Sequence, residues 1–428
     1  MFISKLTSQD VGKSVTIKGW IVHTRFSWKV GFIEFRDGSD FIQCVVEEKI
    51  VGENNFNTLK ECGIETSLII NGIVSKHPKK EEYEIQTQSF EIITKTNDYP
   101  ISEKEHGPEF LIENRHLWLR SKKQRAIQRV RNTIINATYD WFANHDFIKI
   151  DAPIFTPSAC EGSTTLYKVE HVNGEMMYLS QSWQLYIEAG IMAHGRVFDF
   201  GPVFRAEKSK TRRHLNEFWM MDAEMAFTTH KENLEIQEQL IYHIVQTVLE
   251  KNAKELMILE KDVEKLKKVQ IPFIRKDYVD VIKELQGMGS DIKIGDDLWA
   301  DDETLLMEKY ENCVFVQKYP KHVKAFYMKE DPENPWYVLN ADLLAPEGVG
   351  EVIGWSERES DYDTLVKKLE EEKLPIEAYK RYLDLRKYGG VPHAWFGYWL
   401  ERLVRWMCGV HHIRETIPFP RYANRITP

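Results

Sequence analysis

Apolar and polar residues alternate in five short segments within the first 95 residues of the chain. The segments are VTIKGWIVHTR, GFIEFRDGS, FIQCVVEE, SLIINGIVSKH and YEIQTQSFEIIT. Alternation with a period of two is typical of strands that bury one face, and five such strands with turns between them suit an OB-fold, a small partly open β-barrel. We therefore predict an OB-fold over residues 1–95. The barrel alone does not establish a function, because such barrels bind many kinds of partner.

Phe32 lies on the outer face of this predicted barrel. In the segment GFIEF, alternation places Phe32 and Glu34 on one face and Ile33 and Phe35 on the other. Exposed aromatic and amide side chains let unpaired bases stack and be read at their edges. Single-stranded nucleic acid is therefore a candidate partner, and a core position within its strand is the alternative for Phe32.

The pattern changes after residue 95. Residues 96–120 carry proline and charge without a strong period, and we interpret them as a linker. From 121 to 147 apolar residues recur at helical spacing, and FIKIDAPIFTP then predicts a strand interrupted by prolines. A charged run over 228–290 is predicted to be helical and indicates no function.

Residues 200–227 predict a β-hairpin with a cationic loop. One apolar strand ends at Phe204, and a second runs from Phe218 to Phe227. The loop carries five cationic side chains: Lys208, Lys210, Arg212, Arg213 and His214. Arginine is a forked donor for phosphate or carboxylate, and Phe218 offers a stacking face. Charge alone is equally consistent with an ordinary hairpin that has a solvated basic tip.

Length and composition narrow the class of protein. A chain of 428 residues is longer than one hydrophobic core usually serves, so two domains are expected. With 43% hydrophobic and 29% charged residues it is typical of globular proteins, and no apolar run reaches the length of a membrane span. The first residues lack the pattern of a signal peptide, so we expect a cytoplasmic protein with no membrane partner. The five cysteines include no CxxC pair, which argues against a disulfide framework and a zinc site.

The hairpin sequence FRAEKSKTRRHLNEF resembles motif 2 of the class II aminoacyl-tRNA synthetases, in the branch that contains the asparaginyl and aspartyl enzymes. In that family the hairpin holds ATP in a bent form. The resemblance implies that Arg205 bridges the ATP α-phosphate and the amino-acid carboxylate, and that Glu207 accepts from the adenine amino group. It also implies that His214 reaches the terminal phosphates and that Phe218 stacks on adenine.

Two further segments resemble the other motifs of this family, in the same order. The helix and strand from residue 121 to FIKIDAPIFTP resemble motif 1, in which Pro153 lies at the dimer interface, so a homodimer is expected. The segment VPHAWFGYWLERLVRW resembles motif 3, in which Arg402 binds the γ-phosphate. The resemblance implies an α+β chain with an N-terminal OB-fold β-barrel. A class II catalytic domain follows over residues 121–428, built on an antiparallel sheet flanked by helices.

The residues that resemble the family's amino-acid pocket are spread along the catalytic domain. Glu161 pairs with the substrate's α-ammonium group in the relatives, Gln184 is a hydrogen-bonding partner, and Arg358 meets the side-chain oxygen. Aspartyl relatives carry a lysine where this chain has Ile187. An aspartate would be repelled by Asp222, whereas an asparagine amide can accept from Arg358 and donate to Asp222. Because an unpaired buried charge is costly, the pocket predicts L-asparagine.

Metal and RNA contacts are implied in the same way. Asp342 in VLNADLLAPEG and Glu351 in GVGEVIG are expected to hold Mg²⁺ together with phosphate oxygens, because Mg²⁺ keeps several waters and needs few protein ligands. In the barrel, four side chains stand where similar anticodon-binding domains contact RNA: Arg25, Phe32, Gln43 and Glu84.

The reaction implied is the ATP-dependent ligation of L-asparagine to tRNA(Asn). The substrate carboxylate attacks the ATP α-phosphate, pyrophosphate leaves, and the terminal ribose hydroxyl of tRNA attacks the adenylate, so no protein nucleophile is needed. Three alternatives stay open. An aspartyl enzyme is one, since asparaginyl relatives commonly carry glutamate at the position of Asp222. An amide ligase that makes asparagine from aspartate and a non-catalytic RNA-binding relative are the others.

Half of the twelve tryptophans stand where the resembling sequences carry glycine: Trp28, Trp183, Trp299, Trp355, Trp395 and Trp399. Glycine permits a positive φ or a close approach of backbone to ligand, whereas indoles at these positions are expected to fill the adenylate pocket. The codon UGA differs from the glycine codon GGA in one base and is read as glycine in some genetic codes and as tryptophan in others. Translation with the wrong code would produce this pattern, and the 23 glycines, 5.4% of the chain, fall below the usual ~7%. A true non-catalytic relative is the competing interpretation.

Overall fold

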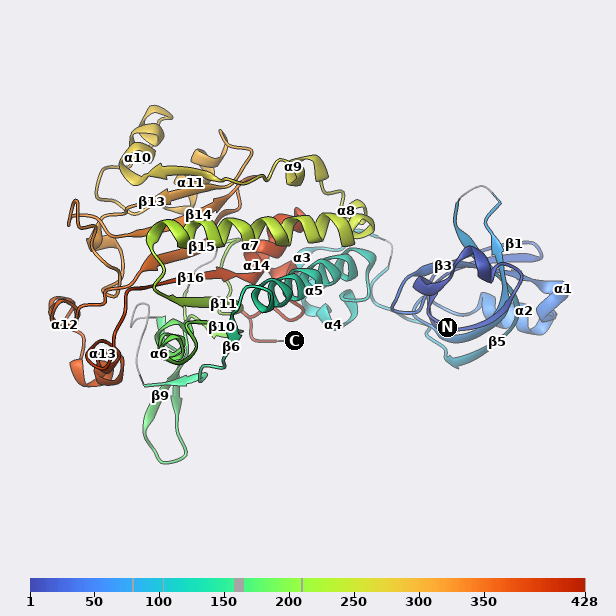
Figure 1. The fold of residues 1–428 in the computed structure, drawn as a ribbon. Coiled ribbons are helices and arrows are strands. Elements are labelled where there is room, and N and C mark those ends of the chain that lie inside the picture. The colour runs from blue at the N-terminus through green and yellow to red at the C-terminus, as the bar shows by residue number, and fades with distance from the viewer. Residues whose placement is uncertain (79–80, 103, 158–164, 209–210, 428) are drawn as a thin grey trace. The chain divides into compact units, whose positions relative to one another are not determined.

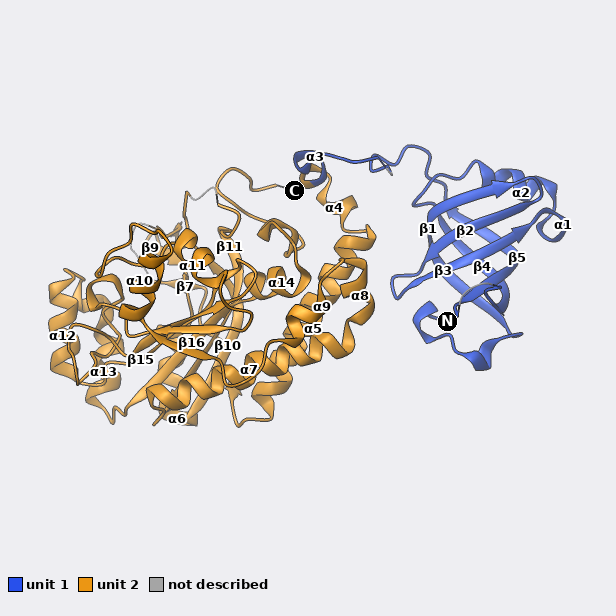
Figure 2. Ribbon diagram, turned by 90° about the horizontal axis from the view of Figure 1, so that it is seen from above, with its two compact units in different colours: residues 1–111 blue, residues 112–428 orange. Residues whose placement is uncertain are grey.

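The structure, a computed structural model, describes residues 1–78, 81–102, 104–157, 165–208 and 211–427. It divides the chain into two compact units, residues 1–111 and residues 112–428 (Figure 2). The boundary falls within the segment 96–120 that we interpret as a linker. The barrel and the remainder of the chain have separate hydrophobic cores.

The first unit contains a closed five-stranded barrel, which confirms the predicted OB-fold. Its strands, in the spatial order β1-β2-β3-β5-β4, are β1 (Ser14–Ser27), β2 (Val30–Arg36), β3 (Phe41–Glu47), β4 (Ser67–Lys76) and β5 (Tyr83–Thr94). Helices α1 (Glu48–Val51) and α2 (Glu53–Lys60) lie between β3 and β4 in sequence. In β2, Ile33 and Phe35 are fully buried, whereas Phe32 and Glu34 are only partly buried. The strands thus bury one face, as their period of two predicts.

Helices α3 (Pro108–Glu113) and α4 (Arg115–Trp118) follow the barrel. Arg115 is buried, and it donates from Nε to the carbonyl oxygen of Pro418 and from a terminal nitrogen to that of Ile417, each at 2.8 Å. Because burial disfavours the charged guanidinium, the pKa of Arg115 falls to about 10, although Glu415 opposes this change. These bonds tie the first residues of the second unit to its C-terminal segment.

The second unit is built on an eight-stranded, mostly antiparallel sheet, as the resemblance implies (Figure 1). Its spatial order is β12-β13-β14-β15-β16-β11-β10-β6, and only the outer pairs β6–β10 and β12–β13 are parallel. In chain order the strands are β6 (Ile148–Lys149), β10 (Arg196–Phe204), β11 (Glu217–Ala226), β12 (Ile274–Asp277), β13 (Val314–Gln317), β14 (Asn340–Ala345), β15 (Gly350–Glu357) and β16 (His393–Trp399).

Two long helices, α5 (Lys122–Ala143) and α7 (His230–Lys251), lie side by side across one face of this sheet (Figure 1). The Thr138 hydroxyl of α5 shares a 2.5 Å hydrogen bond with that of Tyr398 on β16, and Phe142 stacks near Phe396 of the same strand. α5 begins where the Ser121 hydroxyl accepts from a backbone N–H of its first turn. The helices therefore cover the face of the sheet that carries Phe396 and Tyr398, and they leave the opposite face uncovered.

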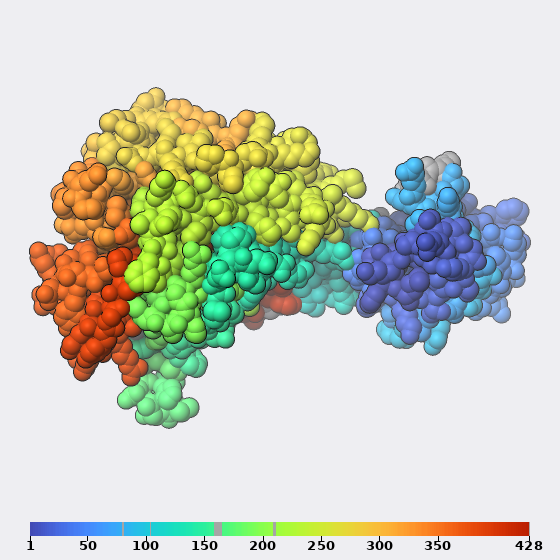
Figure 3. Space-filling model, viewed as in Figure 1, coloured from blue at the N-terminus to red at the C-terminus, as the bar shows by residue number. Residues whose placement is uncertain are grey.

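Shorter elements surround the sheet (Figure 1), and Figure 3 shows the same side of the molecule in space-filling form. The helices are α6 (Gln184–His194), α8 (Ala253–Ile258), α9 (Val263–Lys267), α10 (Tyr278–Gly287), α11 (Ala300–Met307), α12 (Tyr362–Glu371), α13 (Lys380–Lys387) and α14 (Leu400–Cys408). A small sheet has the order β7 (Phe155–Thr156), β9 (Met176–Leu179), β8 (Lys168–Glu170). The run 228–290 is not entirely helical, because β12 interrupts it to extend the main sheet. Among the described residues, no helix has the length and apolar character needed to span a membrane.

Candidate active site

One face of the central strands collects the side chains expected to contact substrate. Phe218, Asp222 and Glu224 alternate onto the same face of β11. Strand pairing sets Gly397 opposite Asp222 and Trp395 opposite Glu224, and cross-strand partners share a face. This face is the one that α5 and α7 leave uncovered, and we call it the site face.

Strands β10 and β11 form the hairpin that the sequence predicts. Arg205 follows β10, and its backbone N–H donates to the carbonyl oxygen of Asn216 at 3.0 Å, which holds the hairpin together beyond the strand end. The guanidinium carbon of Arg205 lies 5.6 Å from the centre of the Phe218 ring. Glu207 and His214 face each other, with 3.9 Å between a carboxylate oxygen and the imidazole Nε2. The four hairpin residues predicted to bind ATP thus form two close pairs.

The cationic loop of the hairpin also makes structural contacts. Arg213 donates to the Glu303 carboxylate at 3.0 Å and to the carbonyl oxygen of Gly348 at 2.9 Å. It is therefore engaged with α11 and the β14–β15 turn. Burial lowers the pKa of His214, and the neighbouring Arg402 lowers it further, so the imidazole is neutral over a wider pH range than an ordinary histidine.

Arg402 of motif 3 lies on α14, shortly after the end of β16. A terminal nitrogen donates to the backbone oxygen of Glu351 at 2.7 Å and to its carboxylate at 3.2 Å. The guanidinium carbon lies 3.6 Å from the centre of the Trp399 ring, and that of Arg205 lies 4.8 Å from the same ring. The two arginines predicted to bind phosphates therefore lie against one indole.

The two predicted metal ligands converge on Gly354. A β-carbon built at this glycine would lie 3.2 Å from a carboxylate oxygen of Glu351 and 3.8 Å from one of Asp342. Lys324 donates to the other oxygen of Asp342 at 2.8 Å. Burial raises the pKa of Asp342 to about 6, with Lys324 opposing the shift and Glu351 adding to it. Two acidic side chains that point to one place are a donor set that fits Mg²⁺, which prefers oxygen ligands.

Arg358 is fully buried and held by two side chains on the site face. Its Nε and one terminal nitrogen donate to the two carboxylate oxygens of Glu224, both at 3.0 Å, and the other terminal nitrogen donates to the Gln184 side-chain oxygen at 3.0 Å. A forked pair of this kind fixes both the position and the charge of the guanidinium. Burial raises the pKa of Glu224, Arg358 opposes this shift, and the neighbouring Glu188 adds to it.

A second buried cation, Arg386, balances a second acid. Arg386 forms an ion pair with Glu188, which also lies 2.9 Å from His393 and 3.8 Å from Arg358. Burial alone would raise the pKa of Glu188, but Arg386 and His393 bring it down to about 2. One oxygen or nitrogen each from Glu188, Glu224 and His393 lies within 4.8 Å of the others. Because two arginines neutralise the two carboxylates, we interpret this cluster as an ion-pair network and not as a metal site.

Asp222 lies at the centre of the site face and is fully buried. One carboxylate oxygen accepts from the Ser182 hydroxyl and from the backbone N–H of Trp183, both at 2.8 Å, and the other accepts from the Trp395 indole at 3.2 Å. Burial raises the pKa of Asp222 to about 7, although these hydrogen bonds oppose the shift. Glu161, the fourth residue predicted for the amino-acid pocket, lies outside the described residues.

The six tryptophans predicted to be glycine do not all lie in this site, which corrects our expectation. Trp183, Trp395 and Trp399 lie on the site face and are buried. Trp355 pairs with Phe396 across the strands, so it faces the helices, where its ring packs 4.6 Å from that of His230. The remaining two, Trp28 and Trp299, are exposed on the surface.

The predicted RNA contacts lie on neighbouring strands of the barrel, where Arg25 is exposed, Phe32 and Gln43 are partly buried and Glu84 is buried. The guanidinium carbon of Arg25 lies 5.1 Å from the centre of the partly buried Phe32 ring. On the next strands, the Gln43 amide donates to the Glu84 carboxylate at 3.0 Å, and the Gln86 amide donates to its other oxygen at 2.9 Å. A stacking ring, a cation and an ordered amide–carboxylate pair are the kinds of group that read an unpaired base.

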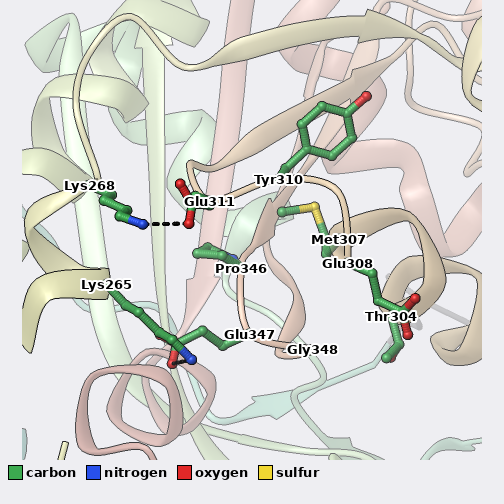
Figure 4. A pocket seen from close by; sticks show the side chains of 10 residues that line it. All are labelled: Lys265, Lys268, Thr304, Met307, Glu308, Tyr310, Glu311, Pro346, Glu347 and Gly348. Carbon is green, nitrogen blue, oxygen red and sulfur yellow. Dashed lines mark hydrogen bonds and ion pairs between the residues drawn. The ribbon is translucent and has the colours of Figure 1, made fainter. Parts of the chain in front are cut away.

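A pocket of about 330 Å³ is lined by residues other than those predicted to bind substrate, metal or RNA (Figure 4). Its walls come from α9, α11, the residues that directly follow these helices, and the β14–β15 turn: Lys265, Lys268, Thr304, Met307, Glu308, Tyr310, Glu311, Pro346, Glu347 and Gly348. Lys268 forms an ion pair with Glu311, and Lys265 lies 3.8 Å from Glu347. The cations of this pocket are therefore compensated by its acids, and it contains none of the predicted site residues.

Sequence reasoning did not find three of the buried charges that organise the site. Glu224 stands two residues after Asp222 in a strand, so alternation alone could have placed it on the site face. Glu188 stands one turn after Gln184 in α6, and the same helical spacing could have indicated it. Lys324 lies in an irregular segment between β13 and β14, where no period exists to reveal it.

Comparison with known proteins defines the class to which this architecture belongs. Residues 107–423 match the family model described as tRNA synthetases class II (D, K and N), and residues 15–93 match that of the OB-fold nucleic acid binding domain. The chain belongs to the class II tRNA synthetases of this D, K and N group. It is an aminoacyl-tRNA ligase, as the three motifs imply.

Solved structures extend this similarity over the whole chain. Asparaginyl-tRNA synthetase from Pyrococcus horikoshii, complexed with asparaginyl-adenylate, is 40% identical, with a TM-score of 0.97 over 100% of this chain and 99% of that one. Asparaginyl-tRNA synthetase from Entamoeba histolytica is 30% identical, with a TM-score of 0.93 and the same coverage. A putative aspartyl-tRNA synthetase from Leishmania major Friedlin shares the fold at 24% identity, with a TM-score of 0.87 over 100% of this chain and 94% of that one.

Proposed function

We propose that this enzyme ligates L-asparagine to tRNA(Asn) through an asparaginyl-adenylate, with ATP as the energy source. The observation that carries the choice of amino acid is the charge balance around Arg358. Its guanidinium already holds the Glu224 carboxylate by two 3.0 Å hydrogen bonds. With Arg386 balancing Glu188, the pocket has no net positive charge to offer a second carboxylate.

A neutral side chain fits this balance better than a charged one. An aspartate would bring an additional negative charge next to Glu224 and Asp222, in a site where burial already raises the pKa of both acids. An asparagine amide can accept from Arg358 or Gln184 and donate to Asp222 without changing the net charge. The fully buried Ile187, one turn along α6 from Gln184, supplies no second cation. The asparaginyl-tRNA synthetase from Pyrococcus horikoshii, which carries asparaginyl-adenylate, supports the same assignment.

In this proposal the hairpin and motif 3 bind ATP. Arg205 contacts the α-phosphate and the amino-acid carboxylate, Arg402 contacts the γ-phosphate, and His214 reaches the terminal phosphates. Phe218 stacks on adenine, and Glu207 accepts from its amino group. The position of both guanidinium groups against the Trp399 indole supports their binding to one polyphosphate, where forked charge-assisted hydrogen bonds would stabilise charge that develops at phosphorus.

Asp342 and Glu351 would hold Mg²⁺, which would neutralise phosphate charge and orient the leaving pyrophosphate. Before the ion binds, Lys324 compensates Asp342 and Arg402 compensates Glu351. Glu161 would pair with the α-ammonium group of the substrate. With the carboxylate and the α-phosphate held in line, positioning and electrostatics are sufficient for adenylate formation.

The proposal includes tRNA and a second copy of the chain. Arg25, Phe32, Gln43 and Glu84 would bind the anticodon, and the acceptor end would reach the adenylate. A homodimer through motif 1 is supported by exposed apolar side chains where that motif ends, at Ile148, Ile154 and Phe155. Apolar side chains in one exposed segment are typical of a subunit interface. No part of the proposal requires a membrane.

Amino-acid-dependent ATP–pyrophosphate exchange tests the proposed substrate. We expect exchange with asparagine and little with aspartate when the protein is purified from its own cells. Exchange with aspartate alone would show that the substrate is misassigned. A matched pair of variants tests the electrostatic reason, because Ile187→Lys adds a cation beside Gln184 and should raise exchange with aspartate. Ile187→Met has a similar length without charge and should leave the preference unchanged.

A further inference from the structure

The indole of Trp399 occupies the space in which a nucleotide base would stack on Phe218. The two rings are themselves stacked, with centroids 4.7 Å apart and planes inclined by 27°. The guanidinium groups of Arg205 and Arg402 lie over the same indole, at 4.8 and 3.6 Å from its centre. An adenine on Phe218 and this indole exclude each other, because both need the same face of the ring.

Two further indoles fill the amino-acid side of the site. Trp395 donates to Asp222 at 3.2 Å, and the guanidinium carbon of Arg358 lies 4.8 Å from its ring. Trp183 is 2% exposed and packs against Gly201 of β10, where a β-carbon would lie 3.4 Å from the indole. A substrate that contacts Asp222 and Arg358 would have to displace the Trp395 ring, and the buried Trp183 indole packs beside it on the same face of the sheet. The protein with these three tryptophans is therefore closed to its own adenylate.

The backbone of β16 lies too close to Asp222 to accept a side chain at its central position on the site face. Gly397 lies between Trp395 and Trp399 on the site face, and a β-carbon there would approach the Asp222 carboxylate to 2.2 Å. This value is far below normal contact distance, so only glycine fits at 397. If 395 and 399 were also glycine, three successive site-face positions would lack side chains, and the bare strand would form the floor of the pocket.

The two exposed tryptophans also occupy positions that suit glycine. Trp28 has φ +44° and is 86% exposed at the first position of the two-residue turn between β1 and β2. Two-residue hairpin turns need a positive φ there, which glycine adopts without strain and a bulky residue does not. Trp299 is 72% exposed at the N-cap of α11. Its indole has no acceptor oxygen for the first helical N–H groups, whereas glycine is accepted at this position.

We propose that six residues are glycine in the protein as the cell makes it, because their codons are UGA and are translated as glycine: Trp28, Trp183, Trp299, Trp355, Trp395 and Trp399. UGA and GGA differ in one base, and some genetic codes read UGA as tryptophan. One codon read with the wrong code explains why the same residue type recurs at unrelated sites. It would also raise glycine from 23 residues, 5.4%, to 29, or 6.8%, near the usual ~7%. For Trp355, on the helix-facing side of β15, no contact among the described residues argues for glycine.

With glycine at 183, 395 and 399, the residues proposed to bind ATP and those proposed to bind the amino acid would border one continuous space. Phe218, Arg205 and Arg402 then border the same space as Asp222 and Arg358, and this space suits an aminoacyl-adenylate. Asp222 loses its indole donor and presents a carboxylate oxygen to the substrate. The inference rests on the proposed function, because an open pocket matters only to an enzyme that forms an adenylate.

The gene and the native protein test the codon assignment directly. We expect UGA at these six positions and UGG at Trp20, Trp118, Trp141, Trp219 and Trp406. In peptide mass spectrometry of the protein from its own cells, the tryptic peptide 388–402 should carry glycine at 395 and 399. The peptide 406–414 is the internal control and should carry tryptophan at its first residue. UGG codons, or tryptophan in peptide 388–402, would overturn the inference.

A set of recombinant chains tests the consequence for the site. The chain with all six tryptophans should show no detectable ATP–pyrophosphate exchange, and the chain with six glycines should be active. Glycine at 183, 395 and 399 alone should restore exchange, whereas glycine at 28, 299 and 355 alone should not. Equal exchange activity in the six-tryptophan and six-glycine chains would refute the claim that the indoles block the pocket. If native peptides carry glycine but no amino acid supports exchange, the codon assignment holds and the proposed function fails.

Discussion

The substitution Glu224→Gln should move the amino-acid preference of the enzyme toward aspartate. Glu224 takes both hydrogen-bonding edges of Arg358 at 3.0 Å, and it is the nearest of the negative charges around that guanidinium. Glutamine keeps the shape and one acceptor oxygen but removes the charge. The Arg358 guanidinium then has no carboxylate on its two hydrogen-bonding edges, and a substrate carboxylate can neutralise it.

The magnitude follows from Coulomb's law. A unit charge at about 5 Å in a medium of effective dielectric constant about 20 contributes about 3 kcal/mol, which corresponds to about 100-fold. We therefore expect the ratio of kcat/KM for aspartate to that for asparagine to rise by about two orders of magnitude. ATP–pyrophosphate exchange with each amino acid, on the active form of the chain, measures this ratio.

A matched control separates specificity from folding. Glu401 is also buried and pairs with Arg131 at 2.8 Å, but it lies on α14, and no contact joins it to the described residues of the amino-acid pocket. Loss of one partner from a buried pair costs about 3–5 kcal/mol of folding free energy, so both Glu224→Gln and Glu401→Gln should lower Tm. Only Glu224→Gln should alter the ratio of kcat/KM for aspartate to that for asparagine. An unchanged ratio in Glu224→Gln would refute the charge-balance argument.

Three further predictions follow from the described contacts. Arg205→Ala and Arg402→Ala should each abolish pyrophosphate exchange in the active form, while far-UV circular dichroism stays unchanged. Retained exchange in either variant would refute the proposal that the substituted arginine binds a phosphate. Phe32→Ala should weaken tRNA charging by about 1–3 kcal/mol, the value of one base stack, and leave exchange unaffected; impairment of both steps would place Phe32 in the barrel core instead. Glu188, whose pKa falls from 4.5 to about 2, stabilises the fold above pH 4.5, and this stability is lost as pH falls toward 2. In Glu188→Gln, the denaturation free energy should therefore depend less on pH in this window, and an unaltered dependence would contradict the ion-pair network.

Open alternatives to the proposed function differ in what they predict for the same measurements. An aspartyl enzyme predicts exchange with aspartate from the native protein. An amide ligase predicts asparagine formation from aspartate, ATP and ammonia, without a need for tRNA. A non-catalytic relative predicts UGG codons and a chain that does not bind ATP, because three indoles would then occupy the site permanently.

Much of the fold could be predicted from the sequence because the relevant signals are local. Strands of the barrel bury one face, so their residues alternate, and the structure confirms this alternation in β2. The hairpin of β10 and β11 was equally clear, since two apolar runs flank a charged loop. By contrast, β12 was missed inside a predicted helical run, because a four-residue edge strand is too short to establish a period against its charged surroundings.

The chemistry of the site divides in a similar way. The sequence by itself determined the class of protein and predicted the residues proposed to bind phosphate, since the three motifs are contiguous segments with fixed spacing. It could not determine the state of Arg358, whose forked bond to Glu224 joins residues 134 positions apart. The partners of a buried charge depend on which strands are neighbours, and distant pairings of this kind leave no period in the chain.

The tryptophans show both sides of this division. The sequence alone indicated six unusual positions, because the segments around them resemble ones that carry glycine. Only the tertiary structure decided that three of them lie buried on the site face, that Trp355 faces the helices and that Trp28 and Trp299 are on the surface. The physical reason is the register of β15 and β16. Successive side chains of a strand point to opposite faces, and strand pairing determines which of those faces binds substrate.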